Sequence, residues 1–196
     1  MMFGRWRKRR TPWAEEVLWS LDLEARGLDM RRDHILSVGM VPVRQARIRY
    51  GESWYQLVRP PQDHVPQPEA LRVHHILPEE AATAPSLREV LLEIFSRLGS
   101  YRLLLHHSRL DLGLLKQAFG QVGLRWPRPE VVDTVDLLTR MNRRRRLLEP
   151  HAEPYSTALA EPRAELGLPP HRAHHALSDA VATAELYLAL QHRLEG

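Results

Sequence analysis

Four carboxylates and one imidazole stand in three short segments of this 196-residue chain. Asp22 and Glu24 share an apolar run near the N-terminus, Asp111 lies in the middle of the chain, and His174 precedes Asp179 by five residues. The apolar run has the composition of a strand, on which residues two apart point to the same face. Two acids on one face of a hydrophobic strand disfavour folding unless a cation lies between them, and a divalent metal is the usual one. The first pair therefore predicts metal-dependent chemistry.

The other two carboxylates have an alternative explanation. Asp111 and Asp179 each fall near the start of an expected helix, where a carboxylate complements the helix dipole. The order of the three segments along the chain, rather than either residue alone, favours a shared site.

Composition is that of an ordinary globular protein, with 43% hydrophobic and 27% charged residues. The formal charge of +4 permits a polyanionic partner such as nucleic acid. The chain has no cysteine, which excludes disulfides, thiolate nucleophiles and cysteine-ligated zinc. It also shows no apolar run long enough to span a membrane, and no apolar stretch follows the basic start as an export signal would require. We therefore expect a cytoplasmic protein with no membrane partner.

Hydrophobic periodicity predicts an α/β fold. Runs typical of strands occur at residues 17–24, 35–43, 46–58 and 101–105. Apolar stripes with helical spacing occur at residues 86–98, 108–120, 133–141, 155–166 and 177–194. The short connections between the first three strands predict antiparallel pairing, and the later alternation of helix and strand predicts parallel strands. The expected architecture is a mixed central β-sheet, with three antiparallel N-terminal strands plus parallel strands, flanked by helices.

Two basic segments lie outside these elements. We expect residues 1–14 to form a basic N-terminal arm and residues 15–196 to form a single domain. The arginine run at residues 143–146 comes just before Glu149 and Pro150, which predicts an exposed, mobile loop. A phosphate-binding role for this run stays open beside that of a solvated loop.

Three motifs contain the five residues. They are Leu-Asp-Leu-Glu-Ala-Arg-Gly-Leu-Asp at 21–29, His-His-Ser-Arg-Leu-Asp at 106–111 and His-His-Ala-Leu-Ser-Asp-Ala at 174–180. In this order they resemble the motifs of the DEDD-type 3′–5′ exonucleases of the His-containing (DEDDh) subtype, and especially the proofreading epsilon subunits of bacterial DNA polymerase III. Weaker similarity occurs at residues 73–76 and 132–134. The resemblance covers residues 17–192.

This resemblance implies an RNase H-like fold and a two-metal hydrolysis that releases nucleoside 5′-monophosphates from a 3′ end. The implied cofactors are two divalent ions, Mg²⁺ or Mn²⁺. The implied metal ligands are Asp22, Glu24, Asp111 and Asp179. His174, which stands five residues before the last aspartate as the family's base does, would accept the proton of the attacking water, whereas His175 would be a flanking residue. The implied substrate contacts are Ala25, Arg26, Gly27, His74 and His107.

The implied partner is a nucleic acid 3′ end, with single-stranded DNA favoured, and a DNA polymerase is a further implied partner in proofreading or repair. RNA 3′-end trimming or oligoribonucleotide degradation remains the alternative, because no motif marks contacts to a 2′-hydroxyl. Ala25, Arg26 and His107 differ from the family's usual residues, which motivates a third hypothesis of a catalytically weak module that binds a polymerase or a nucleic acid end. The chain stops soon after the third motif, so we expect a stand-alone nuclease or one recruited through its basic arm.

Paired histidines at residues 74–75, 106–107 and 174–175 raise the question of a structural zinc. Adjacent histidines rarely chelate one metal together, and two of the pairs belong to the motifs above. We therefore predict no zinc site.

Overall fold

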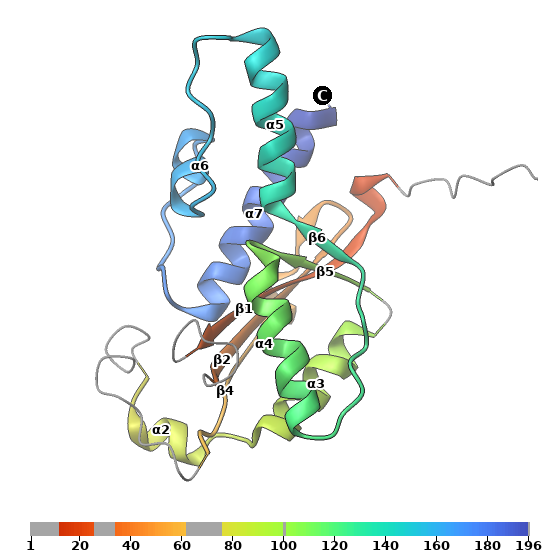
Figure 1. The fold of residues 1–196 in the computed structure, drawn as a ribbon, viewed down its shortest axis with the longest axis vertical. Helices are drawn as coiled ribbons and strands as arrows, with labels where there is room; N and C mark the ends of the chain where they lie inside the picture. The colour runs from red at the N-terminus through yellow and green to blue at the C-terminus, as the bar shows by residue number, and fades with distance from the viewer. Residues whose placement is uncertain (1–11, 26–33, 62–75, 100, 196) are drawn as a thin grey trace, which may run out of the picture.

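A computed structural model describes residues 12–25, 34–61, 76–99 and 101–195 (Figure 1). Within these residues six strands form one sheet in the order β3-β2-β1-β5-β6, and β4 also pairs with β2. The strands are β1 (Val17–Ala25), β2 (Ile35–Arg44), β3 (Arg47–Ile48), β4 (Trp54–Leu57), β5 (Arg102–Leu105) and β6 (Val131–Asp133). Strand β2 runs antiparallel to β1, β3 and β4, whereas β5 runs parallel to β1 and to β6. The predicted mixed sheet is confirmed.

The third predicted strand, 46–58, is wrong as a continuous element. It consists of β3 and β4, separated by the 3₁₀ turn Tyr50–Glu52, and both short strands pair with β2. The break lies opposite Pro42 of β2, whose carbonyl accepts a hydrogen bond from the Arg49 backbone at 2.9 Å. Proline has no N–H to donate on that side, so the ladder cannot continue through this position. Strand β6 was not predicted as a strand.

The helices are α2 (Pro78–Thr83), α3 (Leu87–Leu98), α4 (Ser108–Gln121), α5 (Thr134–Leu148), α6 (Ala160–Glu165) and α7 (Ala176–Glu195). Helix α3 begins as expected, because Ser86 and Glu89 form a reciprocal capping box, and it ends at Gly99. Helix α4 begins at Ser108, where the predicted helix begins, but Ser108 is already helical and does not cap it. The residue that precedes the first turn is His107, in a left-handed conformation.

The predicted mobile loop at 143–146 is also wrong, because these arginines are helical and α5 continues to Leu148. Arginine is a good helix former, and cations near a helix C-terminus complement its dipole. The predicted helix 155–166 is shorter than expected, since only α6 is helical. Asn142 explains this difference: its side chain accepts from the Tyr155 backbone N–H at 2.7 Å and donates to the Tyr155 carbonyl at 2.9 Å, which holds that segment extended.

Alternation along β1 divides the core into two layers. Trp19, Leu21 and Leu23 pack with α3 and α4, whereas Leu18 packs with α5 and α7 on the opposite face. Figure 1 shows α5 and α7 side by side. Asp22 and Glu24 are separated from Leu18 by even numbers of positions along β1. They therefore point to the same face of the sheet as Leu18, which is the face that α7 covers. Within the described residues, no helix is both long and apolar enough to cross a membrane.

Helix α7 lies unusually close to the sheet at its first turn. Gly39 of β2 pairs with Asp22 of β1, and a Cβ atom on Gly39 would overlap the backbone of Ala176 and Leu177. One turn further along, the Ser20 hydroxyl donates to the Ala180 carbonyl at 2.7 Å. The sheet therefore contacts the helix backbone directly, and this contact positions the start of α7 beside Asp22.

We predict that Gly39→Ala lowers the free energy of unfolding by about 1–3 kcal/mol, because the added methyl forces α7 away from the sheet. Urea and thermal unfolding followed by circular dichroism measure the change. Gly120→Ala in α4 is the matched control, since nothing lies within 4 Å of the position a Cβ would take there, and it should be neutral or slightly stabilising. Equal stabilities of the two variants would show that α7 does not depend on the close approach.

Candidate active site

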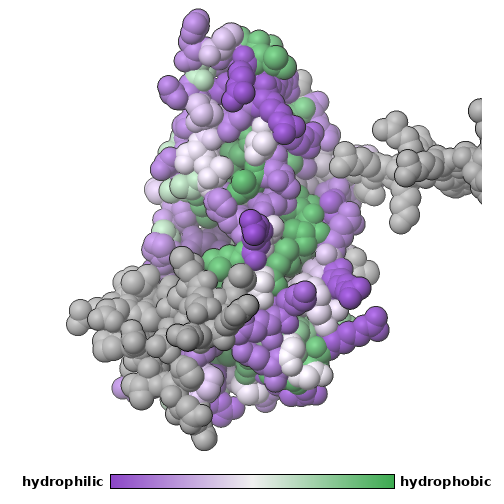
Figure 2. Space-filling view, viewed as in Figure 1, coloured by the Kyte–Doolittle hydropathy of each residue, from purple (hydrophilic) through white to green (hydrophobic). Residues whose placement is uncertain are grey.

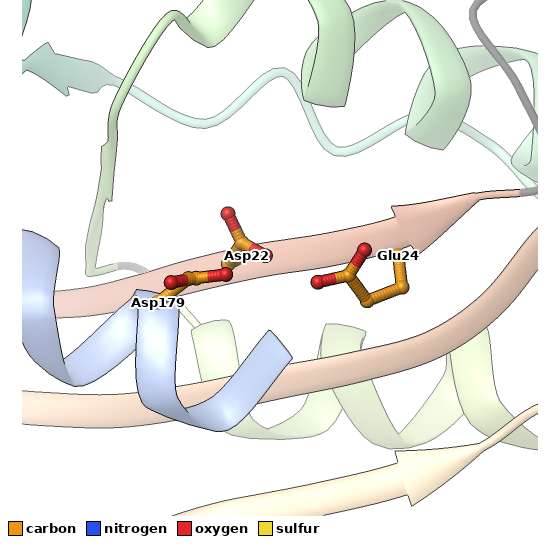
Figure 3. A group of neighbouring side chains, drawn as sticks. All are labelled: Asp22, Glu24 and Asp179. Atoms are coloured by element: carbon orange, nitrogen blue, oxygen red, sulfur yellow. The ribbon is translucent and has the colours of Figure 1, made fainter. Parts of the chain in front are cut away.

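Three of the predicted carboxylates converge on one point. Asp22 and Glu24 project from the same face of β1, and Asp179 projects from the first turns of α7 (Figure 3). One oxygen of each lies within 4.8 Å of the others, an arrangement that could hold a metal ion. Glu24 is only 7% exposed. The structure thus brings together residues that are 157 positions apart in the chain, from 22 to 179.

Asp111 approaches the group from α4. It stands in the first turn of that helix and is 6% exposed. Its carboxylate accepts a hydrogen bond from the Leu23 backbone, between the two acids of β1. The negative charge of Asp111 also raises the pKa of Asp22. The fourth carboxylate therefore borders the group, although it lies outside the set of three whose oxygens are closest.

The site carries an excess of buried negative charge. Burial raises the pKa of Glu24 to about 7, and the charge of Asp179 adds to this shift. Burial is also the main cause that raises the pKa of Asp22 well above its usual value, followed by the charges of the other three acids. Burial raises the pKa of Asp111 and of Asp179 as well. Hard carboxylate oxygens are the ligands that Mg²⁺ and Mn²⁺ prefer, so the donor set fits a divalent metal.

Both oxygens of Asp179 have close polar neighbours. Its Oδ2 accepts the backbone N–H groups of His174 at 2.9 Å and His175 at 3.3 Å, and its Oδ1 lies 3.1 Å from Nε2 of His171. The side chains of His171 and Asp179 are 11% and 13% exposed. His171 was not predicted as a site residue, because it stands three residues before the third motif and belongs to no recognisable sequence pattern.

The two histidines of the third motif differ in their surroundings. The ring of His175 stacks on Tyr55 of β4, with centroids 4.7 Å apart and planes inclined by 17°. His174 is exposed, and its backbone has a φ of +62°, a left-handed conformation that is strained for a non-glycine residue. The imidazole of His174 is thus at the surface beside Asp179, whereas that of His175 is packed.

The rings of His106 and His107 both contact the backbone at Thr157. The Nε2 atoms of both rings lie close to the Thr157 carbonyl, at 2.8 and 2.9 Å. A carbonyl only accepts, so Nε2 of His106 carries its proton and Nδ1 accepts from the Thr134 hydroxyl at 2.6 Å. Burial lowers the pKa of His106 to about 4, which keeps this ring neutral.

The predicted substrate contacts have different outcomes. His107 binds the Thr157 carbonyl instead of standing free. Ala25 ends β1 just after an irregularity in the ladder and packs partly against the core. Arg26, Gly27 and His74 lie outside the described residues. Substrate contact by these five residues stays a prediction.

Asp133, at the end of β6, connects two elements at the site. Its Oδ2 accepts from the Ser108 backbone at 2.8 Å, and its Oδ1 accepts from the Val135 backbone at 2.9 Å. It therefore ties the starts of α4 and α5 together and fixes the turn that contains Asp111. The weak similarity at residues 132–134 pointed to this position but did not reveal its role.

Comparison with known proteins establishes the family. Residues 20–187 match the family model RNase_T, described as exonuclease. The chain belongs to this exonuclease family. It is 27% identical over 176 residues to the 3′-5′ exonuclease DinG of Staphylococcus epidermidis, covering 89% of this chain and 18% of that protein. It is 26% identical over 177 residues to DNA polymerase III subunit epsilon of Haemophilus influenzae, covering 87% of this chain and 65% of that protein. The chain thus spans less than two thirds of the length of either relative.

A solved structure confirms the fold. Exonuclease I of E. coli, in a complex with a dT13 oligonucleotide, superposes on this exonuclease domain with a TM-score of 0.74 at 21% identity, covering 92% of this chain and 43% of that one. At this identity the likeness concerns the fold alone. The predicted RNase H-like fold and the predicted DEDD-type exonuclease family are confirmed, whereas membership of the His-containing subtype stays a prediction.

The raised carboxyl pKa values predict a pH-dependent stability of the metal-free protein. Groups whose pKa is higher in the folded state bind more protons there, so their contribution to the free energy of unfolding is lost as the pH rises from about 4 through about 7. A bound divalent ion replaces those protons. We therefore expect the gain in melting temperature on adding Mn²⁺, relative to EDTA, to increase between about pH 5 and pH 8.

Asp22→Asn is the control for this measurement, because it removes one acid while keeping the shape of the side chain. It should flatten the pH dependence in EDTA and reduce the gain with Mn²⁺. A gain that is the same at both ends of the pH range would contradict protonation of the site in the metal-free protein.

Proposed function

We propose that this chain is a metal-dependent 3′–5′ exonuclease that hydrolyses the terminal phosphodiester bond of single-stranded DNA and releases nucleoside 5′-monophosphates. The observation that carries the proposal is the convergence of Asp22, Glu24 and Asp179, with Asp111 beside them, in a member of the exonuclease family. Four buried or half-buried carboxylates with raised pKa values are costly in a folded protein unless they bind cations. Their retention therefore favours catalysis over a purely binding role.

Asp22, Glu24, Asp111 and Asp179 would hold two Mg²⁺ or Mn²⁺ ions. When bound, such ions supply a water nucleophile and stabilise charge on the attacking and leaving oxygens. The water oxygen would attack phosphorus, and the bond from phosphorus to the 3′-oxygen of the penultimate nucleotide would break, leaving its electron pair on that oxygen, which takes up a proton from solvent and becomes a hydroxyl. The released nucleotide keeps the phosphate on its 5′ carbon.

His174 would accept the proton of the attacking water. Its position supports this role, because the ring is exposed beside Asp179 and its backbone donates to the Asp179 carboxylate. Imidazole is the side chain that most often serves as a general base at neutral pH. His175 is a weaker candidate, since its ring is stacked on Tyr55.

We propose DNA as the substrate because of the proteins that this chain resembles. One of them is a DNA polymerase III subunit, and one solved structure with the same fold is bound to an oligodeoxynucleotide. The similarity to the polymerase subunit also supports association with a DNA polymerase, in proofreading or repair. We also propose that residues 15–196 form the catalytic domain and that residues 1–14 are an appended arm.

The first test uses end-labelled single-stranded DNA and RNA of the same sequence, incubated with Mg²⁺ or Mn²⁺. We expect stepwise shortening of the DNA from its 3′ end. Asp22→Asn should reduce the rate by about 10³-fold or more, because several kcal/mol of transition-state stabilisation depend on the metals. Faster shortening of the RNA would transfer the proposal to RNA trimming, and no shortening of either strand would overturn it.

A second test distinguishes His174 from His175 as the proposed general base. His174→Ala should lower kcat by about 10²–10⁴-fold, the usual contribution of a general base, while the Mn²⁺-dependent gain in melting temperature stays unchanged. His175→Ala is the matched control and should change kcat much less. If the control loses its activity instead, the base has been assigned to the wrong ring.

A further inference from the structure

Helix α5 carries five arginines between residues 140 and 146. Two of them have partners within the protein. Arg144 donates from Nη1 to the carbonyl of Arg193 at 2.9 Å, at the end of α7. Arg145 lies over the ring of Tyr155, 4.5 Å from its centroid, and contacts Glu165 at 3.2 Å. These two arginines therefore have structural roles that account for them.

The other three, Arg140, Arg143 and Arg146, have no such explanation. All three are exposed, and no carboxylate in the described part of the chain lies within ion-pair distance of them. They stand three residues apart on α5, on the side opposite the buried Leu137, Leu138 and Met141. We call these three residues the arginine ridge. At ~1.5 Å per residue the ridge is about 9 Å long.

The ridge is electrostatically unfavourable when nothing binds it. Like charges three or four residues apart on a helix repel each other. The helix dipole compensates cations only in the last turn, which contains Arg145 and Arg146 but neither Arg140 nor Arg143. Figure 2 shows hydrophilic residues over this end of the molecule. A polyanion with regularly spaced charges would relieve the repulsion.

The ridge lies on the helix that begins beside the active site and leads away from it. Helix α5 follows Asp133 directly, and Asp133 binds the backbone of Ser108 in the turn that holds Asp111. Arg140 lies six residues beyond Thr134, or about 9 Å along the helix, and Arg146 about 18 Å. A strand whose 3′ end occupies the site and whose body follows α5 would place phosphates several nucleotides from that end beside these guanidinium groups.

We propose that the arginine ridge binds the phosphates of the strand on the 5′ side of the nucleotide being removed. The proposal rests on the proposed function, because it extends the same substrate beyond the site. At ~3.4 Å per phosphate along a stacked strand, about 9 Å corresponds to about three phosphates, one for each arginine. Contacts to phosphate carry no sequence information, which suits an enzyme that must degrade any sequence.

The test uses the triple variant Arg140→Gln, Arg143→Gln and Arg146→Gln, whose side chains have no partner to lose in the described structure. Binding to single-stranded oligonucleotides is measured by fluorescence anisotropy in an Asp22→Asn background, so that nothing is cleaved. Loss of three phosphate contacts should weaken binding of a strand of about 20 nucleotides by about 10–100-fold at ~0.1 M salt and reduce the slope of log K against log salt by about 2. Single variants should each reduce the slope by about 0.7.

A matched control removes three exposed arginines elsewhere, through Arg47→Gln, Arg125→Gln and Arg128→Gln. It changes the net charge equally and should leave the slope almost unchanged. With Asp22 intact, the ridge variant should also degrade an oligonucleotide of about three nucleotides at the rate of the unmodified protein, because so short a strand does not reach α5. An unchanged slope in the ridge variant, or an equal loss in the control, would overturn the proposal. Absence of cleavage by the unmodified protein would count against the proposed function alone.

Discussion

The backbone of α7 touches β2 at Gly39, and the geometry of the site depends on this contact. Gly39 is paired with Asp22, so the place where the helix comes closest to the sheet is also the place where the first acid stands. The hydrogen bond from Ser20 to the Ala180 carbonyl fixes the next turn. A side chain at position 39 would separate the helix from the sheet and remove Asp179 from the metal-binding group.

Attraction does not bring the four acids together, because every pair of them repels. The apolar layers on both faces of β1 supply the free energy that holds them close, and burial then raises their pKa values until protons or a divalent ion neutralise the charge. A bound divalent ion would thus contribute to the stability of the site as well as to its proposed chemistry. This explains why one set of residues should control both melting temperature and turnover.

Hydrophobic periodicity was sufficient to predict the mixed sheet, and strand alternation placed Asp22 and Glu24 on one face. The order of the three motifs, through the family that it resembles, predicted the family and the convergence of these two acids with Asp179. The sequence could not show the break between β3 and β4, which follows from a missing N–H on Pro42 of a neighbouring strand. The loop predicted for the arginines at 143–146 was wrong. The density of charge suggested a loop, but the helix propensity of arginine and the favourable interaction of cations with the helix dipole extend α5 through these residues. His171 and Asp133 were missed because their roles depend on contacts across the fold.

The loop before α7 connects the proposed base to a proposed metal ligand. The backbone N–H groups of His174 and His175 both bind Oδ2 of Asp179, so the conformation that presents the His174 ring also sets the angle of the carboxylate. This arrangement strains the backbone of His174, whose φ is left-handed, and Nε2 of His171 lies 3.1 Å from the other oxygen of Asp179. A loop that moved His174 away from the site would release Asp179 as well. Base and ligand therefore reach their working positions together, because one set of hydrogen bonds determines both.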